Sequence, residues 1–271
     1  MNKEEKLNYL IDVLINESDE YKNVEIPTNF QDKVSLLRSL MNIRMPRKIS
    51  YEFLEVQNQF LKEQVKEKGI VKLEDIKTLK EDNPNSKLPF ADKISLWQGD
   101  ITRLQVDAIV NAGNNKLLGC FVPCHGCIDN IIHFCAGVEL REECNEIMKK
   151  QGHDEETGKA KITDAYNLPS KKVIHTVGPI VYGDLTKKLE EDLMNCYKSC
   201  LEIALENNIH SIAFCCISTG EFRFPNKRAA QIAIETVINF INENDYEFDR
   251  IIFNVFKNID REIYQTLLKS L

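Results

Sequence analysis

The chain has 271 residues, a formal net charge of −7 from 35 Lys and Arg against 42 Asp and Glu, and 43% hydrophobic residues. These values exclude disordered, collagen-like and coiled-coil chains, and the acidic balance argues against nucleic acid as the main partner. The longest apolar runs, 212–217 and 251–256, fall far short of the roughly 20 residues of a membrane helix. The acidic, amphipathic N-terminus does not resemble a signal peptide, so we expect a cytoplasmic protein, with the nucleus as the alternative location. We also expect a monomer.

Three amphipathic helices are predicted at the start of the chain. Apolar residues recur with helical spacing over 7–15, over 30–41 and in a third run after Ser50, a residue type favoured as a helix N-cap. The segment 80–89 combines Pro, Asn and Ser with charged residues and ends this pattern. We therefore predict an N-terminal helical extension over residues 1–80.

After residue 90 the pattern changes to short apolar strands that alternate with helices. The predicted strands are 93–97, 106–110, 173–177, 212–217 and 251–256, and the predicted helices are 128–150, 186–206, 226–243 and 259–270. Near-continuous apolar strands between helices are typical of a largely parallel sheet covered on both faces. The sequence thus predicts an α/β domain over 90–271, with its ligand site at the carboxyl ends of the strands.

The loops after three of these strands are rich in Gly, Asn and small residues: 99–102, 111–115 and 218–222. Such loops expose backbone N–H groups, which suits a diphosphate, beside amide side chains that suit the hydroxyls of a sugar. Any one of them is more simply a turn or a helix cap. Three at neighbouring strand ends would line a single crevice.

The strings WQGDITRLQVDAIVNAGN, CIDNIIHFCAG and ISTGEFRFP resemble a macrodomain, the three-layer α/β module that binds ADP-ribose. The resemblance implies that Asp100 and the backbone of Ile101 contact adenine, and that Asn111 and Asn114 face the distal ribose. It also places Phe256 where an aromatic ring stacks on adenine. The implied diphosphate loop is Ser218, Thr219, Gly220, Glu221 and Phe222.

A cysteine-rich segment, CFVPCHGC, stands between Gly119 and Ile128. Together with the N-terminal strings IPTNF and RSLMNIRMP, it resembles the zinc-dependent macrodomains linked to microbial sirtuins. Cys120, His125 and Cys127 are a donor set that suits Zn²⁺, and three protein ligands leave one position open for water or substrate. Two alternatives remain: Cys124 closes the site as a fourth ligand, or the loop is a redox site without metal.

Asp129 and Asn114 are the predicted catalytic residues. Asp129 matches the aspartate of the family at the entrance to the next helix, where it would orient or deprotonate the attacking water. The simpler alternative is that Asp129 caps that helix. His133, one turn further on, is expected to pack or to support the site rather than bind zinc.

The resemblance, together with these residues, implies a zinc-dependent hydrolase that removes mono-ADP-ribose from protein side chains, with Asp and Glu esters favoured as the linkage. The alternatives are a non-catalytic reader of ADP-ribose and a deacylase of O-acyl-ADP-ribose. The expected partners are ADP-ribose and a mono-ADP-ribosylated protein. The resemblance adds a sirtuin-type ADP-ribosyltransferase or a lipoyl-carrier protein as further partners.

Overall fold

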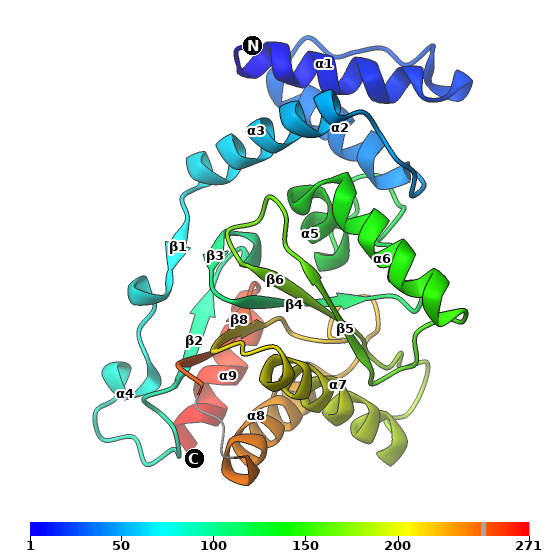
Figure 1. The fold of residues 1–271 in the computed structure, drawn as a ribbon. Helices are drawn as coiled ribbons and strands as arrows, with labels where there is room; N and C mark the ends of the chain where they lie inside the picture. Colours follow the sequence, from blue (N-terminus) through cyan, green and yellow to red (C-terminus); the bar gives the residue numbers. More distant parts are fainter. Residues whose placement is uncertain (245–247, 271) are drawn as a thin grey trace.

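A central sheet between two layers of helices forms the body of the protein, and a helical unit lies against one of these layers (Figure 1). Residues 1–244 and 248–270 are described in this computed structural model. The helices are α1 (Lys3–Asn16), α2 (Phe30–Ile43), α3 (Tyr51–Lys68), α4 (Leu79–Asp82), α5 (Ile128–Ala136), α6 (Val138–Gln151), α7 (Lys187–Glu206), α8 (Asn226–Glu243) and α9 (Asn258–Ser270), with short 3₁₀ helices at Asp19–Tyr21, Leu73–Asp75 and Ile101–Arg103. The strands are β1 (Val71–Lys72), β2 (Ile94–Gln98), β3 (Leu104–Gln105), β4 (Ala108–Gly113), β5 (Ala160–Asp164), β6 (Lys172–Val177), β7 (Ser211–Phe214) and β8 (Arg250–Val255).

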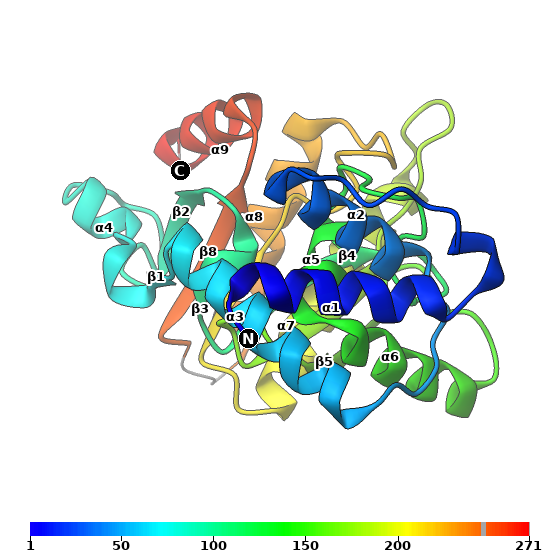
Figure 2. The ribbon, with the colours of Figure 1, turned by 90° about the horizontal axis from the view of Figure 1, so that it is seen from above.

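The main sheet has the strand order β2-β8-β7-β4-β6-β5, and its strands pair in parallel except β5, which is antiparallel to β6. Helices α5 and α6 cover the face toward the helical unit, and α7, α8 and α9 cover the other (Figures 1 and 2). This arrangement confirms the predicted three-layer α/β fold with a mixed, largely parallel sheet. Strand β5 was not predicted, because its sequence AKITD carries charged residues and reads as a loop.

The helical unit formed by α1, α2 and α3 has its own apolar core, which includes Leu10, Leu37 and Phe60 and also takes in Phe134 of α5. The predicted cap is present, since Ser50 Oγ accepts a hydrogen bond from Phe53 N at 3.2 Å. The unit ends earlier than residue 80. Residues Ile76 and Leu88 belong to the core around the sheet, and β1 pairs with β3, so the segment after α3 is attached to the α/β body.

The helix predicted over 128–150 is in fact two helices, α5 and α6, which break at Gly137. The φ angle there is +103°, and a Cβ atom would lie 2.7 Å from Gln57 Nε2, so only glycine fits. The carbonyl oxygen of the Gln57 side chain accepts from Val138 N at 2.9 Å and satisfies the start of α6. The periodicity of the sequence continued through this break and concealed it.

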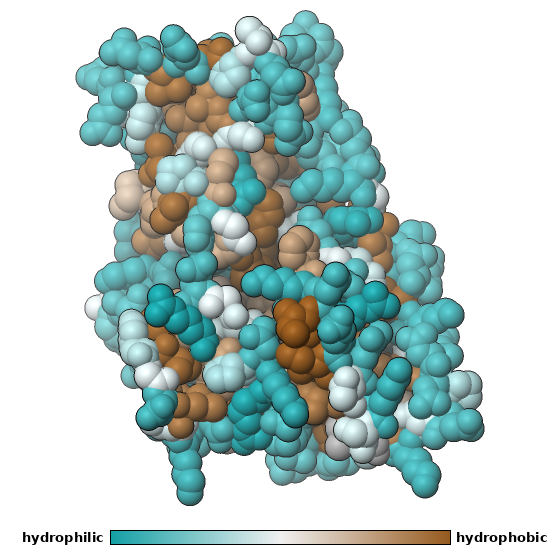
Figure 3. Space-filling model, turned by 180° about the vertical axis from the view of Figure 1, so that it is seen from behind, coloured by the Kyte–Doolittle hydropathy of each residue, from teal (hydrophilic) through white to brown (hydrophobic). Residues whose placement is uncertain are grey.

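From behind, hydrophobic residues show only in patches on the helical unit and the body (Figure 3). Among residues 1–244 and 248–270, no helix combines the length and apolar character needed to cross a membrane.

Candidate active site at the carboxyl ends of the strands

The parallel pairing of β2, β8, β7 and β4 brings the ends of these four strands to the same edge of the sheet (Figure 1). The loops that begin there carry Asp100 after β2, Phe256 after β8, Ser218 after β7 and Asn114 after β4. Loops that are separate in the sequence thus share one edge, as ligand sites of open α/β sheets do.

Asp100 is fixed by its neighbour. Its Oδ1 accepts from Thr102 N at 3.0 Å and from Thr102 Oγ1 at 2.7 Å, and its Oδ2 lies 3.8 Å from Lys68 Nζ. Ile101 is buried and begins the following 3₁₀ turn. Phe256 lies one residue beyond β8 rather than on the strand, and 73% of its surface is exposed, so its ring is free to stack on a ligand.

The loop 218–222 is held as a tight turn by its own backbone. Ser218 has a φ of +63°, and its carbonyl oxygen accepts from Phe224 N at 2.9 Å. The Ser218 hydroxyl is buried without a hydrogen-bond partner among the described residues, and Gly220 and Glu221 are exposed. Buried polar groups are normally satisfied, so an unpartnered hydroxyl beside exposed backbone fits a site that a polar ligand completes.

Asn111 lies inside β4 and is fully buried, so the loop expected over 111–115 begins only after Gly113. Its Nδ2 donates to Asp129 Oδ1 at 2.8 Å and lies 3.1 Å from His175 Nδ1. The other ring nitrogen of His175 lies 3.0 Å from Thr163 Oγ1. Asn111 therefore connects the candidate catalytic carboxyl to a chain of polar side chains in the core. The resemblance had instead implied that Asn111 faces the distal ribose.

Asp129 occupies the first turn of α5 and is 4% exposed. It does not cap the helix, because the N-cap is Cys127, whose sulfur accepts from Asn130 N at 3.4 Å. Burial raises the pKa of the Asp129 carboxyl to about 6, although the Asn111 hydrogen bond and the charge of Arg141 act in the opposite direction. A pKa near neutrality is what a general base requires.

Asn114, the other candidate catalytic residue, supports the loop that follows it. Its Nδ2 donates to Gly119 O at 3.1 Å, and its Oδ1 accepts from Lys116 N at 3.0 Å. Both ends of the amide are thus used to shape the loop that leads into the cysteine-rich segment.

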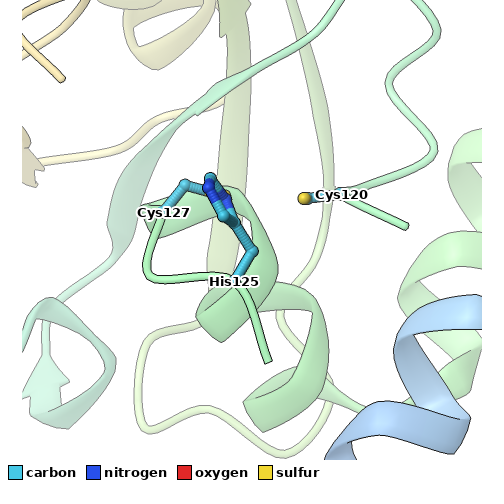
Figure 4. A group of neighbouring side chains, drawn as sticks. All are labelled: Cys120, His125 and Cys127. Carbon is cyan, nitrogen blue, oxygen red and sulfur yellow. The ribbon is translucent and has the colours of Figure 1, made fainter. Parts of the chain in front are cut away.

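Cys120, His125 and Cys127 offer donor atoms that all lie within 4.8 Å of one another. The sulfur of Cys120 points toward the His125 ring, which lies beside Cys127 (Figure 4). His125 Nδ1 is buried and has no hydrogen-bond partner among the described residues. Cys124 is turned away, since its Sγ lies 3.2 Å from Ser35 O and 3.2 Å from Ser39 Oγ on α2.

This donor set fits Zn²⁺. Burial raises the pKa of the Cys127 thiol to about 12, and the negative charges of Cys120 and Asp129 add to the rise. Two thiols and a carboxyl so close together repel as anions, and a bound dication removes that repulsion and deprotonates the thiols. The orphaned His125 nitrogen and the absence of Cys124 from the cluster match a site with three protein ligands.

His133 was expected to pack or to support the site, and the structure places it in the core beside His175. With Cys144 these two histidines form a second, fully buried group whose donor atoms also lie within 4.8 Å of one another. His133 Nε2 lies 3.5 Å from Asp129 Oδ1. Thr163, the partner of His175, was missed, because the strand β5 that carries it gave no clear signal.

Comparison with known proteins identifies the family. The family model described as Macro domain matches residues 110–233. The chain is 48% identical over 268 residues to a protein-ADP-ribose hydrolase of Treponema medium, covering 99% of this chain and all of that protein. It is 43% identical to a protein-ADP-ribose hydrolase of Staphylococcus aureus strain MRSA252, covering 96% of this chain and 94% of that one.

A solved macrodomain structure has the same fold as this chain. The Trypanosoma brucei macrodomain in complex with ADP-ribose superposes with a TM-score of 0.66 at 28% identity, covering 85% of this chain and 94% of that one. With the fold, the strand-end loops and relatives that match over almost their whole length, the chain belongs to the protein-ADP-ribose hydrolase family of macrodomain enzymes.

Proposed function

We propose that this enzyme is zinc-dependent and removes mono-ADP-ribose from modified protein side chains, with Asp and Glu esters as the linkage. One observation carries the proposal: Cys120, His125 and Cys127 bring together three donor atoms that suit zinc, and the buried carboxyl of Asp129 follows two residues after Cys127. Relatives at 43–48% identity are named protein-ADP-ribose hydrolases, which supports the substrate class.

ADP-ribose would lie across the carboxyl edge of the sheet. The loop 218–222 offers its backbone N–H groups to the diphosphate, and Phe256 offers its exposed ring to adenine. Asp100, fixed by Thr102, keeps one carboxylate oxygen for the adenine amino group. In this arrangement the distal ribose would lie toward β4 and the cysteine-rich loop.

Asp129 would accept a proton from the attacking water, and hydrolysis of the ester would yield ADP-ribose and the free side-chain carboxylate. The hydrogen bond from Asn111 holds the Asp129 carboxyl in place for this transfer. Zinc, held by Cys120, His125 and Cys127, would polarise the water or a ribose hydroxyl when bound. A sirtuin-type ADP-ribosyltransferase would supply the substrate in the cytoplasm, with a lipoyl-carrier protein as one such substrate.

The test is release of ADP-ribose from an Asp- or Glu-ADP-ribosylated protein by native enzyme, chelator-treated enzyme and treated enzyme with Zn²⁺ restored. We expect release to disappear on chelation and to return with zinc. Undiminished release by zinc-free protein would remove the metal from the proposal. Binding of ADP-ribose without release in any sample would make the protein a reader.

A further inference from the structure

The helical unit touches the cysteine-rich loop through Arg38 on α2. Arg38 Nε and Nη2 donate to Asn130 Oδ1 at 2.9 Å and 2.7 Å, and Nη2 also donates to His125 O at 2.7 Å. Bonds from a guanidinium to two neighbouring acceptors fix both of them in direction as well as position. A residue from outside the α/β body therefore holds the backbone of a candidate zinc ligand.

Asn130 extends this contact to the other side of the loop. Its side chain is fully buried, and its Nδ2 donates to Val122 O at 2.9 Å and lies 3.4 Å from Cys120 O. Because Arg38 carries only donors, it requires the oxygen of the Asn130 amide to face α2 and the nitrogen to face the loop. The pair Arg38–Asn130 thus ties the Cys120 side of the loop to the His125 side.

A second contact from α2 supports the same segment. Asn42 Oδ1 accepts from Cys124 N at 3.0 Å, and Cys124 is held at a φ of +50°. The left-handed conformation is unfavourable for a residue with a side chain and persists only where its surroundings impose it. The turn that presents His125 and Cys127 is therefore shaped against α2.

We propose that Arg38 is a positioning residue for the metal site, and that through it the N-terminal helical unit sets the zinc affinity of the loop 120–127. The inference rests on the proposed zinc-dependent function. Without Arg38 the Asn130 oxygen and His125 O lose their donor, and among the described residues only the contacts of Cys124 still hold the loop to α2, so more of its order must come from the metal. Ordering a mobile loop at the moment of binding weakens that binding.

Gln57 provides a matched control. It is fully buried and docks α3 on the same α/β body, through Val138 N at 2.9 Å and Glu139 Oε2 at 3.1 Å, without contacting the loop 120–127. Gln57→Ala should weaken the attachment of the helical unit and lower the melting temperature. It should leave the zinc affinity unchanged, which separates positioning from simple docking.

The experiment is a chelator competition for Zn²⁺ with the full chain, comparing wild type, Arg38→Met, Arg38→Lys and Gln57→Ala. Loss of a residue that orients metal ligands typically costs about 10- to 100-fold in metal affinity, and we expect this for Arg38→Met. Arg38→Lys keeps the charge but cannot fork to both acceptors, so it should also weaken binding. If Arg38→Met does not fold, the zinc affinity of Arg38→Lys tests the inference in its place.

Two results would overturn the inference. The first is a zinc affinity of the folded Arg38 variants within about twofold of wild type. The second is a loss of zinc affinity in Gln57→Ala as large as the loss in the Arg38 variants. Both leave the proposed zinc-dependent function intact, because wild type still binds the metal. Wild type that fails to bind zinc would reject the proposed metal site and this inference together. The affinity of each variant for ADP-ribose, measured in parallel, should stay at the wild-type value.

Discussion

The side-chain nitrogen of Asn111 joins Asp129 to His175, at 2.8 Å from Asp129 Oδ1 and 3.1 Å from His175 Nδ1. Its two hydrogens serve both acceptors only if His175 is neutral and Nδ1 carries no proton, with Nε2–H directed to Thr163. Burial lowers the pKa of His175 to about 4, which keeps the ring neutral at pH 7. The buried chain thus fixes the orientation of the Asn111 amide, and the amide fixes Asp129.

Replacing Asn111 by Ala should therefore reduce both stability and turnover. Two buried acceptors lose their donor, which costs about 1–3 kcal/mol in the free energy of unfolding. Asn115→Ala is the control, since Asn115 is exposed just beyond the same strand and its side chain donates a surface hydrogen bond to Asp154. Urea unfolding and steady-state hydrolysis measure the two effects. Equal behaviour of the two variants would show that the buried chain has no special role.

The sequence predicted the parts of the site that are local in the chain. Cys120, His125 and Cys127 fall within eight residues, so their spacing indicated that they meet, and Asp129 was assigned from the resemblance. It could not predict that Arg38 binds Asn130, because 92 positions separate them and the contact depends on how α2 docks. The same limit explains Asn111, which looked like a loop residue until pairing of β4 with β6 extended the strand to Gly113.

Cys127 and Cys124 should differ in their effect on zinc. Serine is a good helix N-cap, so Cys127→Ser keeps the capping interaction at the start of α5 while it removes a soft thiolate ligand. We expect loss of zinc and of turnover together, with little change in the melting temperature of metal-free protein. Cys124→Ser should retain zinc, because the Cys124 sulfur faces α2. Zinc content by atomic emission after gel filtration distinguishes them, and zinc loss in the Cys124 variant would argue that Cys124 is a fourth ligand.

Gly119 precedes the cysteine-rich loop 120–127 and Gly126 lies within it, and of the two the backbone requires glycine only at Gly119. Gly119 has a φ of +80°, and a Cβ atom there would lie 2.8 Å from His133 Cγ, whereas a Cβ at Gly126 meets nothing within 4 Å. Gly119→Ala should lower the free energy of unfolding by about 1–3 kcal/mol, and Gly126→Ala should change it by less than about 0.5 kcal/mol. Thermal or urea unfolding checks this, and a reversed order would place the strain at Gly126.

Stability should depend on pH through Glu17, which accepts from Arg44 at 2.7 and 2.9 Å and from Arg47 at 2.8 Å. Burial raises the pKa of this carboxyl, but the hydrogen bonds and charges of both arginines outweigh it and lower the pKa overall. A lowered pKa contributes stability above the unfolded value of about 4.3, and the contribution disappears as pH falls through the folded value. Glu17→Gln should cost about 1–3 kcal/mol at pH 7 and much less at pH 3.

Urea unfolding at the two pH values measures this difference. The control is Glu67→Gln, because Glu67 pairs with Lys3 on the surface with 59% of its side chain exposed, and such pairs contribute little. A cost for Glu17→Gln that is the same at pH 3 and pH 7 would mean that packing, rather than charge, explains the loss.

Asp129→Asn separates catalysis from binding. Asparagine has the same size and still accepts the Asn111 hydrogen bond through its oxygen, so the fold of the site should persist. It cannot take a proton from water, and loss of a general base lowers kcat by about 10²–10⁴-fold. The Kd for ADP-ribose should change by less than about threefold, since the carboxyl is buried in the first turn of α5 and is not part of the diphosphate loop. Asp154→Asn, at an exposed carboxyl that contacts Lys116 near the same strand end, should leave both values at the wild-type level. If Asp129→Asn lost binding in proportion to rate, Asp129 would be a structural support of the pocket, and the proton would have to be accepted elsewhere.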